Sequence, residues 1–260
     1  MNGSVVDITL WEVVASLALV ALAAVVSLWR RAELERDLAL AVLRSFLQLT
    51  AVGYVIQAIF DSDSLWLVAA LLAVMVAFGT VTARSRAEAV PGALLPIGLA
   101  LTAAAVVTLG LVLVLGVFEA EPRYLVPVGG MVIGNAMTAA AVALNRLADE
   151  VSSQRHLIEA TLALGATARQ AASGLVRRSL RSGMIPLIDS TKTTGVVFFP
   201  GTMVGMLIAG AEPVDAVRLQ LILLWSLLGS VALAALIAVS LGYRGFFTEA
   251  QQLRETPLPQ

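Results

Sequence analysis

The chain has 260 residues, of which 59% are hydrophobic and 13% charged, and its mean hydropathy is +0.90. Soluble domains usually carry about 25% charged residues, so this composition excludes an ordinary cytosolic enzyme. A disordered chain is excluded as well, because disorder requires low hydrophobicity. The net charge of -1 provides no basic field for nucleic acid, and the absence of cysteine excludes thiolate metal sites. These limits predict an integral membrane protein with a single domain, residues 1–260.

Seven runs of the sequence are long and apolar enough to cross a membrane, since a spanning helix needs roughly 20 apolar residues. The runs are continuous and do not alternate with period two, which indicates helices and not a transmembrane barrel. We therefore expect an all-α integral membrane protein with seven transmembrane helices. The predicted spans are Ile8–Trp29, Leu38–Phe60, Leu65–Val81, Ala93–Phe118, Tyr124–Leu147, Met184–Ala209 and Val214–Tyr243.

Basic residues are distributed unevenly over the segments that connect these spans. Of the 17 basic residues, 13 fall on one side, two (Arg123 and Arg218) on the other, and two (Arg44 and Lys192) inside the spans. Connections rich in Lys and Arg stay in the cytoplasm. The pattern therefore predicts an N-terminus outside the membrane and a cytoplasmic C-terminus.

The longest cytoplasmic connection, residues 146–183, contains an amphipathic segment. Its residues with helical spacing are Leu157, Ile158, Thr161, Leu162 and Gly165. Gly165 is suited to end this helix, and Thr167 is suited to cap a second helix, predicted over Ala168–Arg181. One interpretation is a helix that lies among lipid headgroups. The other is a docking helix that inserts into a groove of a cytosolic partner.

Two charged residues, Asp189 and Lys192, lie inside the sixth predicted span. Their spacing of three places them on one face of a helix. They either neutralise each other as a pair, or Asp189 faces a transport path, since ionisable groups in membranes usually face a cavity or one another. In the second case Asp189 is the candidate metal ligand, because hard cations prefer oxygen donors. The candidate residues of the path are Asp189, Ser190, Lys192, Thr193, Asn135 and Gln48.

Prolines interrupt the same span. Pro200 and Gly201 predict a helix break or a simple kink, and Pro186 predicts a second break near the cytoplasmic end. Broken helices in membranes often line transport sites. A phosphate-binding loop that ends at Lys192 would require glycine at positions 186 and 191, which the chain lacks. We therefore expect ATP, if it is used, to bind elsewhere.

The amphipathic cytoplasmic segment resembles the Glu-Ala-Ala…Gly loop of ABC-transporter permeases, which docks on the ATP-binding subunit. The Leu-Pro pair of importers does not follow, and Arg178 stands near the position of that proline, which argues against a standard importer permease. By this resemblance the segment is a cytoplasmic coupling helix. The implied coupling residues are Glu159, Ala160, Leu164, Gly165, Ala166, Thr167 and Gln170.

Three segments in order, Gly130–Met137, Leu164–Thr167 and Ile185–Met203, resemble the FetB/YbbM family. This family comprises membrane subunits of an ABC-type exporter linked to iron efflux in bacteria, with a plant branch linked to aluminium tolerance. The resemblance implies a permease of the bacterial inner (plasma) membrane that exports iron or another metal, in two copies. It also implies a separate cytosolic ATP-binding subunit that carries ATP and Mg, so that this chain is not an enzyme and binds no cofactor itself. The alternative is an ion-coupled secondary transporter or channel that uses Asp189.

Overall fold

The computed structural model describes residues 9–62 and 64–254, and its regular elements over these residues are helices, with two isolated β-bridges. Six of the helices in this part of the chain are long and apolar enough to cross a membrane, which confirms an all-helical, multi-pass membrane protein. The elements are α1 (Leu10–Arg30), α2 (Glu35–Ser62), α3 (Leu65–Arg86), α4 (Leu94–Val114), α5 (Pro122–Ser153), α6 (Arg155–Ala163), α7 (Ala168–Thr193), α8 (Gly201–Ile208), α9 (Pro213–Gly242) and the 3-10 turn η1 (Tyr243–Phe246).

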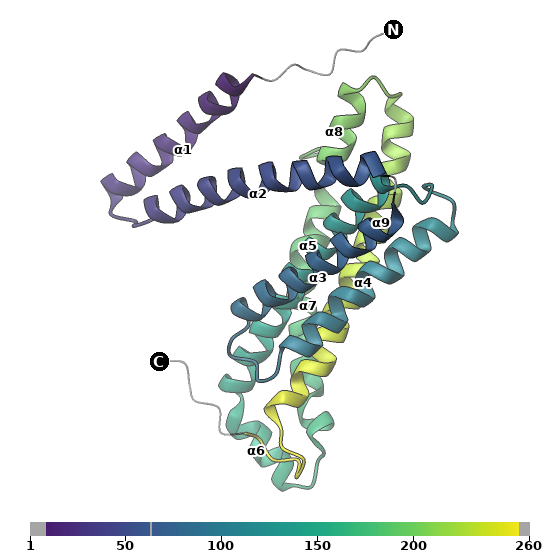
Figure 1. Cartoon of the computed structure of the whole chain (residues 1–260). Helices are drawn as coiled ribbons and strands as arrows, with labels where there is room; N and C mark the ends of the chain where they lie inside the picture. The colour runs from purple at the N-terminus through teal and green to yellow at the C-terminus, as the bar shows by residue number, and fades with distance from the viewer. Residues whose placement is uncertain (1–8, 63, 255–260) are drawn as a thin grey trace.

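Helices α3, α4, α5, α7 and α9 pack together as an elongated bundle, with α6 at its lower end in the view of Figure 1. Most of the buried side chains in this bundle are small, and alanines from α4, α5 and α9 recur along it. Lipid tails are as apolar as these side chains, so helices in a membrane associate through close packing and not through the hydrophobic effect. Alanine permits that packing because it keeps the helix axes close. The larger side chains at full burial include Ile97, Leu101, Leu144 and Leu147.

Helices α1 and α2 form a hairpin that stands away from this bundle, with α2 across its long axis (Figure 1). The turn between them is fixed by Ser27, whose hydroxyl donates to the Glu35 carboxylate (2.9 Å) and accepts from the Leu34 amide (2.9 Å). The far end of α2 is anchored by a small apolar cluster of Ile59, Val68 and Val126. Most other side chains of the hairpin are exposed, so lipid or another protein must cover them.

The first and sixth predicted spans differ from the structure. Helix α1 is described from Leu10, so Ile8 lies outside the described residues. The predicted span Met184–Ala209 is not one helix: α7 ends at Thr193, residues 194–200 form a turn, and α8 begins at Gly201. The turn forms because Gly195 adopts φ +84 and its amide bonds the Phe198 carbonyl (2.9 Å). Because of this interruption, the sixth predicted span is not one long apolar helix. Six of the seven predicted spans therefore remain as uninterrupted helices in the described part of the chain.

The predicted end of a cytoplasmic helix at Arg181 and the predicted break at Pro186 are both wrong. Helix α7 continues from Ala168 through Pro186 to Thr193. A proline inside a helix removes one hydrogen bond, here to the Ser182 carbonyl, and packing can compensate for that loss. The part of the predicted cytoplasmic loop from Ala168 onward and the first part of the sixth predicted span are therefore one continuous helix.

Close contact between α5 and α7 occurs at Gly183, which is buried. A Cβ atom at this position would lie 2.7 Å from the Ala143 Cβ and 2.8 Å from the Ala139 carbonyl oxygen. Neither atom can move aside without moving α5, because both belong to the backbone or are attached to it. Glycine is therefore required at position 183.

Gly183→Ala should lower the stability of the folded chain by about 1–3 kcal/mol, because overpacking forces the two helices apart. The measurement is thermal unfolding in detergent. Gly174→Ala is the matched control on the same helix, where the new Cβ meets only the end of the Arg178 side chain at 3.5 Å. The control should be neutral or stabilising, and an equal loss of stability in both variants would contradict the packing explanation.

Candidate coupling surface and transport pocket

Helix α6 is a short amphipathic helix at the end of the bundle (Figure 1). Ile158 is buried against the bundle, whereas Leu157 is 63% exposed and Leu164, just beyond the last turn, is 90% exposed. Glu159 is paired with Arg155 at 2.9 Å, and its side chain remains 45% exposed. The predicted coupling residues Glu159, Ala160 and Leu164 therefore lie together on the open side of α6. We call this side, with Leu157, the α6 surface.

The turn between α6 and α7 is defined by two capping motifs. At the end of α6, the Gly165 amide bonds the Leu162 carbonyl (2.9 Å) and the Ala166 amide bonds the Thr161 carbonyl (3.3 Å), with Gly165 at φ +90. This is a Schellman motif, which favours glycine because the position is left-handed.

At the start of α7, Thr167 and Gln170 form a capping box. The Thr167 hydroxyl accepts from the Gln170 amide (3.3 Å), and the Gln170 side chain accepts from the Thr167 amide (2.9 Å). This confirms the predicted cap at Thr167. Gln170 and Thr167 thus fix the angle at which α7 leaves the α6 surface.

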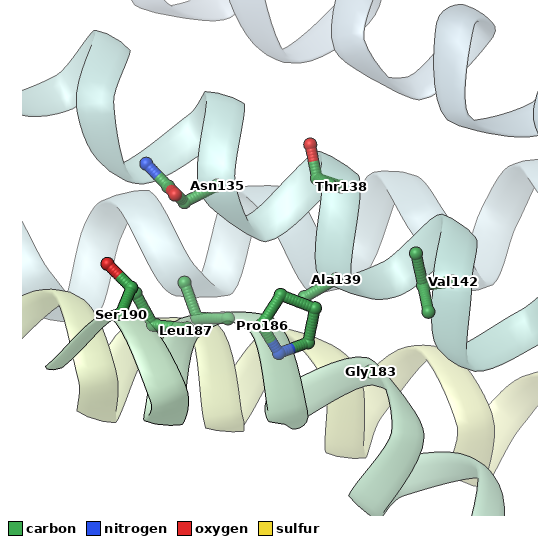
Figure 2. Close-up of a pocket in the computed structure, with 9 residues that line it drawn as sticks. Asn135, Thr138, Ala139, Val142, Gly183, Pro186, Leu187 and Ser190 are labelled. Carbon is green, nitrogen blue, oxygen red and sulfur yellow. The ribbon is translucent and has the colours of Figure 1, made fainter. Parts of the chain in front are cut away.

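A pocket of about 140 Å³ lies between α5 and α7. Figure 2 shows Asn135 and Thr138 on α5 opposite Pro186 and Ser190 on α7. The Asn135 side-chain amide donates to the Met131 carbonyl (2.8 Å), which leaves its side-chain oxygen available. The pocket therefore combines a mostly apolar lining with the uncharged side-chain oxygens of Asn135, Thr138 and Ser190.

Two of the residues predicted for the transport path, Asn135 and Ser190, come together in this pocket. Asp189 and Lys192 are placed elsewhere: they form an ion pair at 3.5 Å, with side chains 63% and 70% exposed. The Thr193 hydroxyl bonds the Asp189 carbonyl (3.0 Å) near the end of α7. Gln48 lies exposed in the middle of α2 and does not line the pocket.

The residues beside Asp189 do not form an evident metal cage. Within residues 9–62 and 64–254, no group of three or more His, Cys, Asp or Glu side chains could hold a metal ion. The neighbouring charged group is the cation of Lys192, which opposes metal binding at Asp189. The geometry favours the structural pair over a resident metal site.

Sequence reasoning missed a buried carboxylate, Glu150, near the end of α5. Its side chain is 5% exposed and bonds Arg146 at 2.6 Å and Arg178 of α7 at 2.8 and 2.9 Å. It also accepts from the side chain of Gln154, the residue between α5 and α6. In the sequence, Arg146 and Glu150 look like an ordinary surface pair at a spacing of four. Only the fold shows that Glu150 is buried and bound by Arg178 of α7.

Two further polar contacts join segments that are distant in sequence. The Thr202 hydroxyl on α8 bonds the buried Gln220 side chain on α9. The Gln251 side chain of the C-terminal segment accepts from the Ala168 amide at 2.8 Å, at the start of α7. Sequence separations of 18 and 83 residues leave no local pattern that could have identified these contacts.

Comparison with known proteins gives one family and several full-length relatives. A family model described as "Uncharacterised protein family (UPF0014)" matches residues 10–247. The protein ALUMINUM SENSITIVE 3 of Arabidopsis thaliana is 39% identical over 92% of this chain and 88% of its own length. The membrane protein STAR2 of Oryza sativa is 40% identical over 93% and 85%. The probable iron export permease protein FetB of Escherichia coli is 36% identical over 97% of both chains. No solved structure matches the chain significantly.

These relatives confirm the predicted resemblance to FetB and to its plant branch. The alignments cover nearly the whole chain, so the resemblance extends to the first half, where the sequence shows topology more than motifs.

Thr167→Ala should destabilise the start of α7 by about 1 kcal/mol, because the amide of Gln170 loses its capping acceptor. Hydrogen exchange of the first turn of α7 measures this effect. Ser173→Ala is the matched control on the same helix, because its hydroxyl bonds only a local carbonyl. Equal exchange rates in the wild type and Thr167→Ala would show that the capping box does not hold this turn.

Proposed function

Because the chain belongs to the UPF0014 family, we propose that it is the membrane subunit of an ABC transporter that exports iron or another metal. A separate cytosolic subunit binds ATP and Mg²⁺, and the chain itself is not an enzyme. The protein acts in the bacterial inner (plasma) membrane, with its N-terminus outside and its C-terminus in the cytoplasm. The name of the Escherichia coli relative supports iron export by a permease, and the distribution of basic residues supports the orientation.

The observation that carries the proposal is the α6 surface. It presents Leu157 and Leu164 beside Glu159 on a helix held at the tip of the bundle. An amphipathic helix of this kind suits a groove in a partner, where its exposed apolar residues act as anchors. The capping motifs on both sides of the α6–α7 turn keep this surface in a fixed position.

Helix α7 connects the α6 surface directly to the pocket. The same helix is capped at Thr167 beside the α6 surface and carries Ser190 in the pocket. A push on α6 therefore reaches the pocket through one continuous helix. Asn135 and Ser190 provide oxygen donors for the cargo, and oxygen is the donor that hard metal ions prefer.

The turn between α7 and α8 supports the presence of a second copy of the chain. Ser190 lies beside Val231 and Thr202 bonds Gln220, so residues 194–200 fall between these two levels of α9. The stretch of α9 over residues 219–243 carries no charge, which supports a location of the turn at membrane depth. Irregular backbone cannot face lipid at that depth and must be covered by protein or line a water-filled cavity. In our proposal two copies enclose this turn and the transport path.

Leu164→Asp should abolish co-purification of the chain with the ATP-binding subunit, since it places a charge on the most exposed apolar residue of the α6 surface. Glu159→Lys, tested in parallel, reverses the charge of the same surface. Truncating an anchor residue typically costs about 2 kcal/mol or more in binding, so a loss of about 30-fold in affinity is expected. Asp215→Lys is the matched control, an exposed acid that pairs with Arg218 at the start of α9.

A complex that survives both α6 variants while the chain remains folded would contradict the docking role of α6. Export that continues in cells without any ATP-binding subunit would favour an ion-coupled transporter instead.

Ser190→Ala should lower metal export without lowering the amount of complex, because alanine removes the hydroxyl from the pocket and adds no bulk. The expected loss is about tenfold, corresponding to one hydrogen bond to a charged cargo. The measurement is efflux of radioactive iron from loaded cells. Gln48→Leu is the control, because Gln48 lies on α2 outside the pocket and this variant should export metal normally. An equal loss of metal export in Gln48→Leu would show that the transport path does not run through the pocket.

A further inference from the structure

The buried carboxylate of Glu150 connects three helices at the cytoplasmic end of the bundle. One oxygen binds Arg146 on α5, and the other binds Arg178 on α7 and Gln154 at the start of α6. Arg178 approaches with two nitrogen atoms, at 2.8 and 2.9 Å, so the contact fixes direction as well as distance. A single side chain therefore sets the relative positions of α5, α6 and α7.

The contact between Glu150 and Arg178 lies on the opposite side of Gly183 from the pocket, so α7 can pivot at Gly183. Gly183 touches α5 so closely that there is no space for a Cβ atom. Arg178 lies on one side of that contact, on the cytoplasmic arm (residues 168–182), and Ser190 lies on the other, on the outer arm (residues 184–193). Because the helix is continuous, a change at Arg178 must alter the position of Ser190.

We propose that Glu150 is a positioning residue that clamps the cytoplasmic arm of α7 to α5 and thereby sets the width of the pocket between Asn135 and Ser190. When the clamp opens, α7 pivots about Gly183 and the pocket changes width. Gln154 links the same carboxylate to the start of α6, so movement of the α6 surface acts on the clamp directly. The route from a docked partner to the pocket passes through this carboxylate.

Ser179, which follows Arg178 in α7, provides a second indication that α7 has an alternative position. Ser179 is fully buried, and its hydroxyl oxygen has no hydrogen-bond partner in the described part of the chain. A buried polar atom without a partner is unfavourable. The clamp therefore holds α7 in a position that leaves this hydroxyl without a hydrogen bond.

The pivot can be measured on the chain alone, because the natural sequence has no cysteine. Spin labels on cysteines introduced at Thr138 and Ser190 report the distance across the pocket. Glu150→Gln should shift and broaden this distance distribution, since an amide cannot hold two arginines. Asp149→Asn is the matched control: it removes one negative charge from the adjacent, exposed position on the same helix.

Arg178→Lys provides a second test that keeps the charge but removes the two-nitrogen contact. It should shift the distance between the two spin labels in the same direction as Glu150→Gln. If Glu150→Gln does not fold, Arg178→Lys alone tests whether the Glu150–Arg178 contact sets the pocket width. A wild-type distribution in the folded variants overturns the clamp, as does an equal shift in Asp149→Asn.

The role in coupling rests on the proposed function and is tested separately, on unlabelled chain in complex with the ATP-binding subunit. Glu150→Gln should leave the complex intact and ATP hydrolysis running while export falls about tenfold, within the usual range of coupling energies between sites. Parallel losses of hydrolysis and export would overturn this role. If no ATP-binding subunit associates with the wild type, the proposed function fails, whereas the distance measurement still tests the clamp.

Discussion

Close packing of small side chains is the constraint on which the rest of this structure depends. In a membrane the hydrophobic effect does not draw helices together, so α5 must approach its neighbours closely enough for dispersion contacts to hold them. Alanines along α4, α5 and α9 and the glycine at position 183 make this possible. The pocket beside α5 adjoins this close contact: Gly183 lines it together with Pro186 and Ser190 of the same helix.

The two groups of charged side chains on α7 and α5 differ in burial and in the helices that they join. The pair of Asp189 and Lys192 is exposed and local, so it contributes little beyond neutralising itself. The cluster around Glu150 is buried at its centre and joins different helices, so removing one member leaves the others without partners. A charge inside a predicted span attracts attention in the sequence, yet the carboxylate with the larger structural role, Glu150, lies beyond the predicted span that ends at Leu147.

Much of the fold could be predicted from the sequence, because helices such as α3, α4 and α9 follow directly from long apolar runs. The turn at Gly165 and the cap at Thr167 were also predictable, since both depend on adjacent residues. The continuity of α7 through Pro186 was not, because it depends on packing against α5 that no local pattern records. For the same reason the pairing of Asn135 with Ser190 in one pocket was foreseen only as a set of candidates, and Glu150 was overlooked.

The hairpin of α1 and α2 has a consequence for how the protein is made. These helices leave the ribosome before any of the bundle exists, and the finished chain gives them few partners beyond the cluster at Ile59. Their entry into the membrane therefore relies on their own hydropathy and on the bond network at Ser27 that closes the hairpin. Because the hairpin precedes the bundle along the chain, its own two helices must hold it in the lipid until α3, α4 and α5 have been made.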